Sequence, residues 1–292
     1  MRSDPADYGF ATPASLREAA ALLAERPGEW VPIAGGTDVM VQFAAGALAA
    51  RNLFSIWNLP ELRRIEAGGS ELQIGAAVTY TEIRRDDIIL SEFPLLARTA
   101  SWTGGIANQN RGTLGGNIAN ASPAADSLPA LLAYDAELIL HSARGERRVR
   151  YDEFHTGYKK MEIAPDELIR AICLPRRFSG YFAYGRKVGA RVAQAISKVC
   201  IMAVGRVANG VVADMRIAAG SVAPVPLRLR ATEQVLMGRV IDANALAEAR
   251  RAAAAETQPI DDIRSTARYR SAVVGNLVEE FLIGLRAAPA KS

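Results

Sequence analysis

The chain has 292 residues, of which 50% are apolar and 23% are charged, and its formal net charge is +4. The length suggests about two domains, and the composition excludes an intrinsically disordered chain and a collagen-like repeat. The 35 basic residues are scattered rather than clustered, so we expect no nucleic-acid partner.

The apolar runs are too short for a membrane span, and the first ten residues carry no apolar segment typical of a signal peptide. We therefore expect a cytoplasmic protein without a membrane span. Cys173 and Cys200 are the only cysteines, and no histidine lies near either. The chain therefore lacks the ligands for an iron–sulfur cluster or a zinc site, and any redox chemistry on it requires an organic cofactor. We assign no catalytic and no metal-binding residue.

Residues 1–58 predict a small unit of helices and strands. Ser15 and Glu18 have the spacing of a capping box, and apolar residues at helical intervals predict a helix over 15–26. Because proline has no backbone N–H, Pro32 indicates either that the next strand lies at a sheet edge or that Pro32 lies at the start of that strand. The elements expected after the first helix are a strand over 30–34, a helix over 38–45 and a strand over 53–57.

Residues 59–177 predict a second unit. Alternating apolar residues indicate a half-buried strand over 72–76, and a helical pattern covers 91–102. Residues 103–120 form the densest glycine region of the chain. Further strands follow, and 144–150 is interpreted as a solvated hairpin tip rather than a binding patch.

Residues 178–292 predict a third, α+β unit. Apolar runs over 199–207 and 211–219 flank Asn209-Gly210, a dipeptide that tolerates positive φ and indicates a β-hairpin. Helical patterns follow over 232–238, 244–256 and 263–285. Cys200 is expected in a buried strand, and His141 and His155 are expected to be structural.

The glycine spacing excludes two common nucleotide-binding motifs, because neither G-x-G-x-x-G nor G-x-x-x-x-G-K-[ST] occurs. Two diglycine segments remain, 34–38 (Ala-Gly-Gly-Thr-Asp) and 113–117 (Thr-Leu-Gly-Gly-Asn). Residues without Cβ allow backbone N–H groups to turn toward one point and approach an anion closely, and threonine adds a hydroxyl donor. We therefore expect two loops that hold a pyrophosphate from two sides.

These segments, with the residues around them, resemble the FAD-binding (medium) subunit of the molybdenum hydroxylases, the family of xanthine dehydrogenase and carbon monoxide dehydrogenase. The resemblance covers nearly the whole chain in the family's order. The segments that carry it are 31–39, 110–126, 157–160, 166–169, 186–189, 195–199 and 220–223.

The resemblance implies an α+β fold with a vanillyl-alcohol-oxidase-type (PCMH-type) FAD-binding part of two subdomains, 1–58 and 59–177, and a C-terminal domain over 178–292. It also implies that Ile169 and Lys198 lie near the flavin ring, where a fixed cation would stabilise the reduced flavin. Thr103 stands where the xanthine enzymes carry an aromatic residue. The cofactor-binding residues implied are Pro32, Ile33, Ala34, Gly35, Gly36, Thr37, Asp38, Val39, Thr103, Thr113, Leu114, Gly115, Gly116, Asn117, Asp126, Ile169 and Lys198.

The resemblance further implies an electron-transfer subunit that binds FAD and works with two partners. These would be a small [2Fe-2S] subunit and a large molybdopterin subunit, assembled as a dimer of heterotrimers. A purine substrate for the large subunit is weakly favoured, and the terminal acceptor is left open. Tyr158, Lys159 and Lys160 are expected at the rim of the site or at a subunit contact.

Two alternatives stay open. A self-sufficient FAD-dependent reductase of the same fold would bind its own substrate and NADPH, but the sequence shows no evident acid for that chemistry. A nucleotide-binding regulatory module would lack redox activity altogether. Identification of the bound cofactor separates the regulatory module from the two redox proteins.

Overall fold

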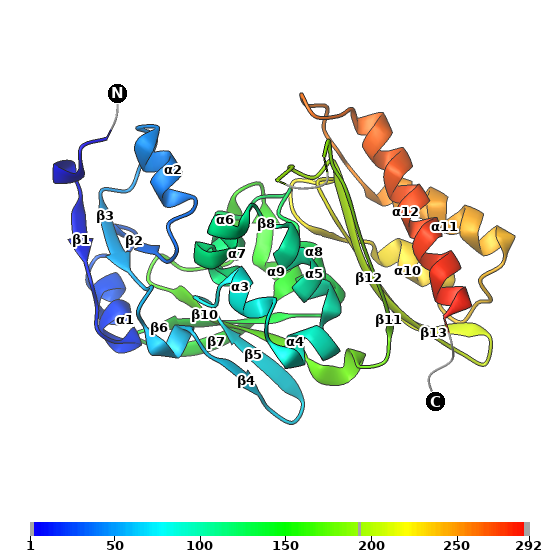
Figure 1. The fold of residues 1–292 in the computed structure, drawn as a ribbon, viewed down its shortest axis with the longest axis horizontal. Coiled ribbons are helices and arrows are strands. Elements are labelled where there is room, and N and C mark those ends of the chain that lie inside the picture. Colours follow the sequence, from blue (N-terminus) through cyan, green and yellow to red (C-terminus); the bar gives the residue numbers. More distant parts are fainter. Residues whose placement is uncertain (1–2, 192–193, 289–292) are drawn as a thin grey trace.

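The computed structural model describes residues 3–191 and 194–288, which fold around three main β-sheets (Figure 1). The N-terminal part contains η1 (Pro5–Asp7), β1 (Gly9–Ala11), α1 (Leu16–Glu25), β2 (Trp30–Ile33), α2 (Val39–Ala44) and β3 (Asn52–Ser55). Its strands are parallel, in the order β1-β3-β2. Ser15 caps α1 by accepting a hydrogen bond from the Glu18 amide (3.2 Å), so the predicted helix start is confirmed. Pro32 lies in β2, an edge strand of this sheet, as expected for a residue without an N–H.

The middle part has a five-stranded antiparallel sheet in the order β4-β5-β10-β6-β7. Its elements are η2 (Pro60–Leu62), β4 (Ile65–Ala67), β5 (Glu71–Gly75), α3 (Tyr80–Ile83), α4 (Asp87–Glu92), α5 (Pro94–Trp102), α6 (Ile106–Arg111), α7 (Leu114–Asn120), α8 (Ser127–Ala133), β6 (Glu137–Ser142), β7 (Gly145–Arg150), α9 (Tyr151–Phe154), β8 (His155–Gly157), β9 (Lys160–Met161) and β10 (Leu168–Pro175). The helices between β5 and β6 pack over one face of the sheet and form a shared apolar core with it (Figure 1).

Two predictions for this part are wrong in detail. The helix expected over 91–102 is two helices, because Pro94 has no N–H to continue α4 and instead begins α5. The diglycine segment 113–117 was expected to be a loop, but it forms the N-cap and first turn of α7, which follows α6 in the glycine-rich region. The hairpin expected around 144–150 is present as β6 and β7, with exposed arginines on β7.

The C-terminal part has a four-stranded antiparallel sheet with three helices. Its elements are η3 (Arg176–Phe178), β11 (Phe182–Val188), β12 (Val199–Ala208), β13 (Val211–Gly220), β14 (Leu227–Arg228), α10 (Arg230–Leu236), α11 (Ala243–Glu256) and α12 (Ala267–Ala287). The predicted hairpin is confirmed, since Asn209 (φ 51°) and Gly210 (φ 77°) form the turn between β12 and β13. The last helix begins at Ala267 rather than at residue 263, because Thr266 is its N-cap and Asp262 pairs with Ser265 in a preceding turn.

The C-terminal sheet is buried on both faces. Along β12, Cys200, Met202 and Val204 belong to the core of the middle part, whereas Val199 and Ile201 belong to the core under α10–α12. Helix α8 packs against β12 and β13 on the first of these faces, and Figure 1 shows α11 and α12 on the other. The near-continuous apolar run of β12, including the buried Cys200 expected there, follows from this double burial. Within the described ranges, every helix is too short or too polar to cross a lipid bilayer.

Candidate functional site

The first diglycine segment is a loop between β2 and α2, as predicted. Gly36 has φ 77°, a left-handed conformation that side chains with Cβ rarely adopt. The backbone amides of residues 35–38 donate to no other described residue, although the carbonyl oxygens of Gly36 and Asp38 accept hydrogen bonds from α2. This loop therefore offers a set of N–H groups to an acceptor from outside the chain.

The second diglycine segment differs from the prediction, because it is the first turn of α7. Thr113 is the N-cap, and its hydroxyl accepts a hydrogen bond from the Gly116 amide (3.1 Å). The amides of Leu114 and Gly115 donate to the carbonyl oxygens of Val78 (3.1 Å) and Ala76 (2.9 Å). The expectation that this segment exposes free amides is therefore wrong. A Cβ on Gly115 would lie 2.6 Å from the Ala76 Cβ, so this glycine serves the close packing of α7 on residue 76.

The fold nevertheless brings the two diglycine segments together. Gly35 lies so close to the backbone before α7 that a Cβ would overlap the Arg111 carbonyl oxygen at 1.6 Å. The Arg111 Nε donates to the Gly35 carbonyl (3.3 Å), and the Asn120 side-chain amide donates to the Asp38 carboxylate (3.2 Å). Sequence reasoning missed Arg111 and Asn120 as part of the site, although both lie within the segment 110–126 that carries the resemblance.

Asp126, which was expected to contact the cofactor, has its carboxylate bonded to two side chains of the C-terminal part. One oxygen accepts a hydrogen bond from the Ser197 hydroxyl, and the other accepts one from the Lys187 ammonium group. All three side chains are buried or nearly so. Burial raises the pKa of Asp126, and Lys187 and Ser197 offset that effect only in part. Lys187 and Ser197 were not singled out from the sequence, although the segments 186–189 and 195–199 contain them.

Lys198 follows Ser197 and is anchored mainly by its backbone. Its amide donates to the Val188 carbonyl (2.8 Å), and its carbonyl accepts a hydrogen bond from Arg270 (3.1 Å). Its ammonium nitrogen lies 5.6 Å from the centre of the Tyr269 ring, which is a cation–π distance. Residues 192–193, within the motif region 186–199, lie outside the described residues.

The other predicted contacts lie in the middle part. Thr103 is the C-cap of α5, and its hydroxyl donates to the Thr99 carbonyl (3.1 Å). Ile169 is buried in β10, within the apolar core that also contains Leu114 and Ile118 of α7. The Asn117 side chain accepts a hydrogen bond from Ser127 (2.7 Å), which links α7 to the start of α8 beside Asp126.

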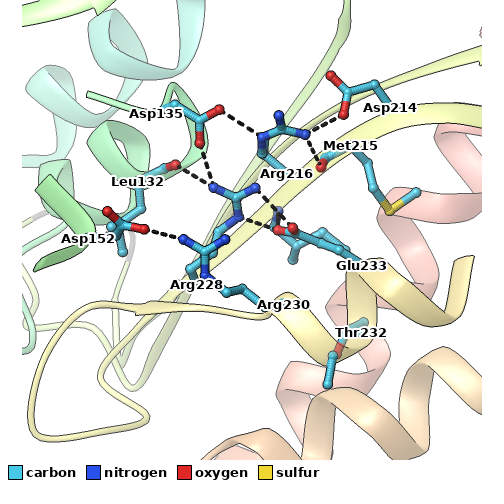
Figure 2. Close-up of polar contacts among 12 residues, drawn as sticks. Leu132, Asp135, Asp152, Asp214, Met215, Arg216, Arg228, Arg230, Thr232 and Glu233 are labelled. Atoms are coloured by element: carbon cyan, nitrogen blue, oxygen red, sulfur yellow. Dashed lines mark hydrogen bonds and ion pairs between the residues drawn. The ribbon is translucent and has the colours of Figure 1, made fainter. Parts of the chain in front are cut away.

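A separate cavity of about 840 Å³ lies where the middle and C-terminal parts meet, and no predicted site residue lines it. Figure 2 shows its central ion pairs, in which Arg228 donates to both Asp135 (2.6 Å) and Glu233, and Arg216 donates to Asp135 (2.8 Å) and Asp214. Every arginine of its lining is paired with a carboxylate; these arginines are Arg150, Arg177, Arg216, Arg228 and Arg230. With its positive charge neutralised in this way, the cavity is a poor site for a cofactor diphosphate.

Comparison with known proteins gives two family matches that together span most of the chain. Residues 6–177 match the model described as the FAD binding domain in molybdopterin dehydrogenase. Residues 184–285 match the CO dehydrogenase flavoprotein C-terminal domain.

Curated relatives match over almost their full lengths. The chain is 33% identical over 275 residues to the xanthine dehydrogenase FAD-binding subunit of Escherichia coli O157:H7, a match that covers 92% of each chain. It is 29% identical over 278 residues to the carbon monoxide dehydrogenase medium chain of Hydrogenophaga pseudoflava, covering 95% of this chain and 96% of the relative.

Solved structures share the whole fold. A carbon monoxide dehydrogenase from Hydrogenophaga pseudoflava, in a form that lacks the Mo-pyranopterin moiety of the molybdenum cofactor, matches with a TM-score of 0.93 at 29% identity. That match covers 98% of this chain and 99% of the other. Quinoline 2-oxidoreductase from Pseudomonas putida 86 has the same fold, with a TM-score of 0.90 at 24% identity and the same coverage.

Proposed function

This chain belongs to the family of FAD-binding domains in molybdopterin dehydrogenase, and from that premise we propose that it is the FAD-binding electron-transfer subunit of a heteromeric molybdenum hydroxylase. The matches confirm the predicted resemblance and the α+β fold of an FAD-binding part with a C-terminal domain. Bound FAD would supply the redox chemistry that links a [2Fe-2S] partner to an external electron acceptor.

The observation that carries this function is the loop over 35–38. Its amides have no acceptor among the described residues, and Gly36 holds the left-handed turn that presents them. Arg111, whose Nε bonds the same loop, adds a cation next to it. Amide and guanidinium donors suit the diphosphate of FAD, so the residues present fit this cofactor.

The other predicted contacts become proposals with roles suited to their surroundings. Asp126 holds Ser197, and thereby places Lys198, whose cation would stabilise negative charge on the reduced flavin. The remaining proposed FAD contacts are Pro32, Ile33, Ala34, Thr37, Asp38, Val39, Thr103, Thr113, Leu114, Gly115, Gly116, Asn117 and Ile169. For α7 the contact would come from side chains or from the Gly116 surface, since its first amides are already bonded.

The complex is proposed to contain a small [2Fe-2S] subunit and a large molybdopterin subunit, as a dimer of heterotrimers. The matched relatives are an FAD-binding subunit and a medium chain, which supports a multi-subunit enzyme. We also propose the division into 1–58, 59–177 and 178–292, because each main sheet lies within one of these ranges. A xanthine-type substrate and a cytoplasmic location stay predictions.

Purification of the native complex through a tag on this chain tests the assembly. We expect FAD, iron and molybdenum in the preparation, and a mass twice the sum of three different subunits. A chain that purifies with FAD but without metals or partners would favour the self-sufficient reductase instead. A chain without FAD after reconstitution would contradict both redox functions.

A matched pair of glycine substitutions tests the loop. Gly36 and Gly210 both have φ 77°, but Gly210 lies in the β12–β13 turn with open space around it. Each substitution with alanine adds similar backbone strain, about 1 kcal/mol. We expect Gly36→Ala to weaken FAD binding at least tenfold and Gly210→Ala to leave it unchanged, as measured by quenching of flavin fluorescence. Equal FAD affinity in the two variants would show that the loop is only a turn.

A further inference from the structure

The hairpin formed by β8 and β9 is fastened to the last turn of α7. The Lys159 ammonium group donates to the Asn120 side-chain oxygen (2.8 Å) and also to the Asn120 carbonyl oxygen. The His155 Nε2 lies 3.0 Å from the carbonyl oxygen of Ile118, which also belongs to the last turn of α7. The Asn120 carbonyl oxygen accepts no backbone hydrogen bond from the described residues, whereas the Ile118 carbonyl oxygen also accepts one from the Ala121 amide (3.0 Å). The hairpin therefore supplies the donor that the end of α7 lacks at Asn120 and adds a second contact at Ile118.

Asn120 extends this connection to the first diglycine loop. Its side-chain oxygen accepts from Lys159, while its side-chain N–H donates to the Asp38 carboxylate (3.2 Å). Only one orientation of the amide satisfies both neighbours, because a flipped amide would place N–H groups against the ammonium and oxygen against the carboxylate. Lys159 thus fixes the orientation of Asn120, and Asn120 holds Asp38.

Two features separate Lys159 from an ordinary surface lysine. Its backbone is left-handed (φ 57°), a conformation that is unfavourable in free energy for any residue with a Cβ. Its neighbour Lys160 is also exposed, yet the Lys160 ammonium group donates to no other described residue. The strained backbone places the Lys159 side chain, and not that of Lys160, over the end of α7.

We propose that Lys159, acting through Asn120 and Asp38, is a positioning residue that holds the loop over 35–38 in its FAD-binding form. This inference rests on the proposed function, because it concerns the same loop. Asp38 ends the loop, and its carboxylate would repel a diphosphate if it turned inward. Its hydrogen bond to Asn120 keeps that charge directed at α7 and keeps the neighbouring amides available.

The test compares Lys159→Met with Lys160→Met in the complex purified through this chain. We expect the first variant to bind FAD about five- to tenfold more weakly and to release it faster, and the second to match the wild type. Lys159→Arg, which keeps the positive charge, is expected to restore most of the affinity. FAD dissociation is followed by the rise of flavin fluorescence after dilution.

A charge exchange shows whether the effect passes through Asn120. Asn120→Asp alone places two carboxylates together and is expected to weaken FAD binding as much as Lys159→Met or more. Adding Asp38→Asn restores a donor opposite the new carboxylate, and we expect the double variant to recover most of the lost affinity. A purely structural role would predict that the second substitution adds to the damage.

The outcomes distinguish this inference from the proposed function. If the wild-type complex binds no FAD, the proposed function fails. If Gly36→Ala loses FAD while Lys159→Met binds it as tightly as Lys160→Met, only the role of Lys159 is overturned. Recovery in the double variant, with weak binding in Lys159→Met, is the result that supports it.

Discussion

At the scale of single residues, the proposed role of Lys198 depends on how firmly its backbone is held. Arg270 is buried in the first turns of α12, where a cation is disfavoured by the helix dipole. It nevertheless donates to the carbonyl oxygens of Lys198 (3.1 Å) and Ser221 (2.9 Å), and Asp262 balances its charge. Because these contacts use the backbone of residue 198, a change of its side chain should leave the segment in place.

Lys198→Met therefore isolates the charge of the side chain. We expect the variant to keep its FAD but to lower the reduction potential of the flavin, because the reduced, anionic form loses a nearby cation. An interaction of about 1–2 kcal/mol between the charges corresponds to about 20–45 mV for a two-electron couple. Spectroelectrochemical titration measures the potential, and Lys198→Arg serves as the control that keeps the charge. An unchanged potential in Lys198→Met would remove this lysine from the site.

At the scale of elements, local chemistry explains which parts of the fold were predictable. The Asn209-Gly210 turn and the Ser15 cap depend on residues within a few positions of each other, so the sequence pattern identifies them. Helix α7 was missed because two adjacent glycines each disfavour a helix by about 1 kcal/mol. The cap at Thr113 and the packing of Gly115 on Ala76 stabilise it, and the second contact spans distant parts of the sequence.

The candidate site shows the same division between local and distant information. The Gly-Gly motif identified the loop, since a left-handed turn with free amides is a property of that short segment. The hydrogen-bond partners of Asp38 and Asp126 could not be predicted from any local sequence pattern. Asn120 lies 82 positions from Asp38, and Lys187 lies 61 positions from Asp126. Only the folded chain shows that Asp126 is held by two side chains of the C-terminal part.

At the scale of the whole molecule, Asp135 joins the middle part to the C-terminal part. It lies between α8 and β6 with φ 48°, and its carboxylate accepts a hydrogen bond from Arg177. The same carboxylate also accepts hydrogen bonds from Arg216 and Arg228 (Figure 2). Although burial would raise the pKa of Asp135, the guanidinium groups of Arg228 and Arg216 hold it below its ordinary value. The ionised carboxylate is therefore stabilised by the folded arrangement of the two parts.

Asp135→Asn is expected to destabilise the protein by about 2–3 kcal/mol at pH 7, because buried Arg228 keeps only Glu233 as its carboxylate partner. Asparagine also adopts positive φ, so the backbone is not strained. The matched control is Asp87→Asn, since Asp87 is exposed and its carboxylate accepts no hydrogen bond from another described residue. Thermal unfolding of the two variants should differ by about 5–10 °C at pH 7.

The pH dependence of that difference identifies its cause. A carboxyl group whose pKa is lower in the folded state stabilises the fold at pH values above its unfolded pKa of about 3.9. This contribution is lost as the pH falls through the lower, folded value. The melting temperatures of wild type and Asp135→Asn should therefore converge below about pH 4, while Asp87→Asn follows the wild type throughout. A gap that stays constant in acid would mean that shape, rather than the charge of Asp135, joins the two parts of the molecule.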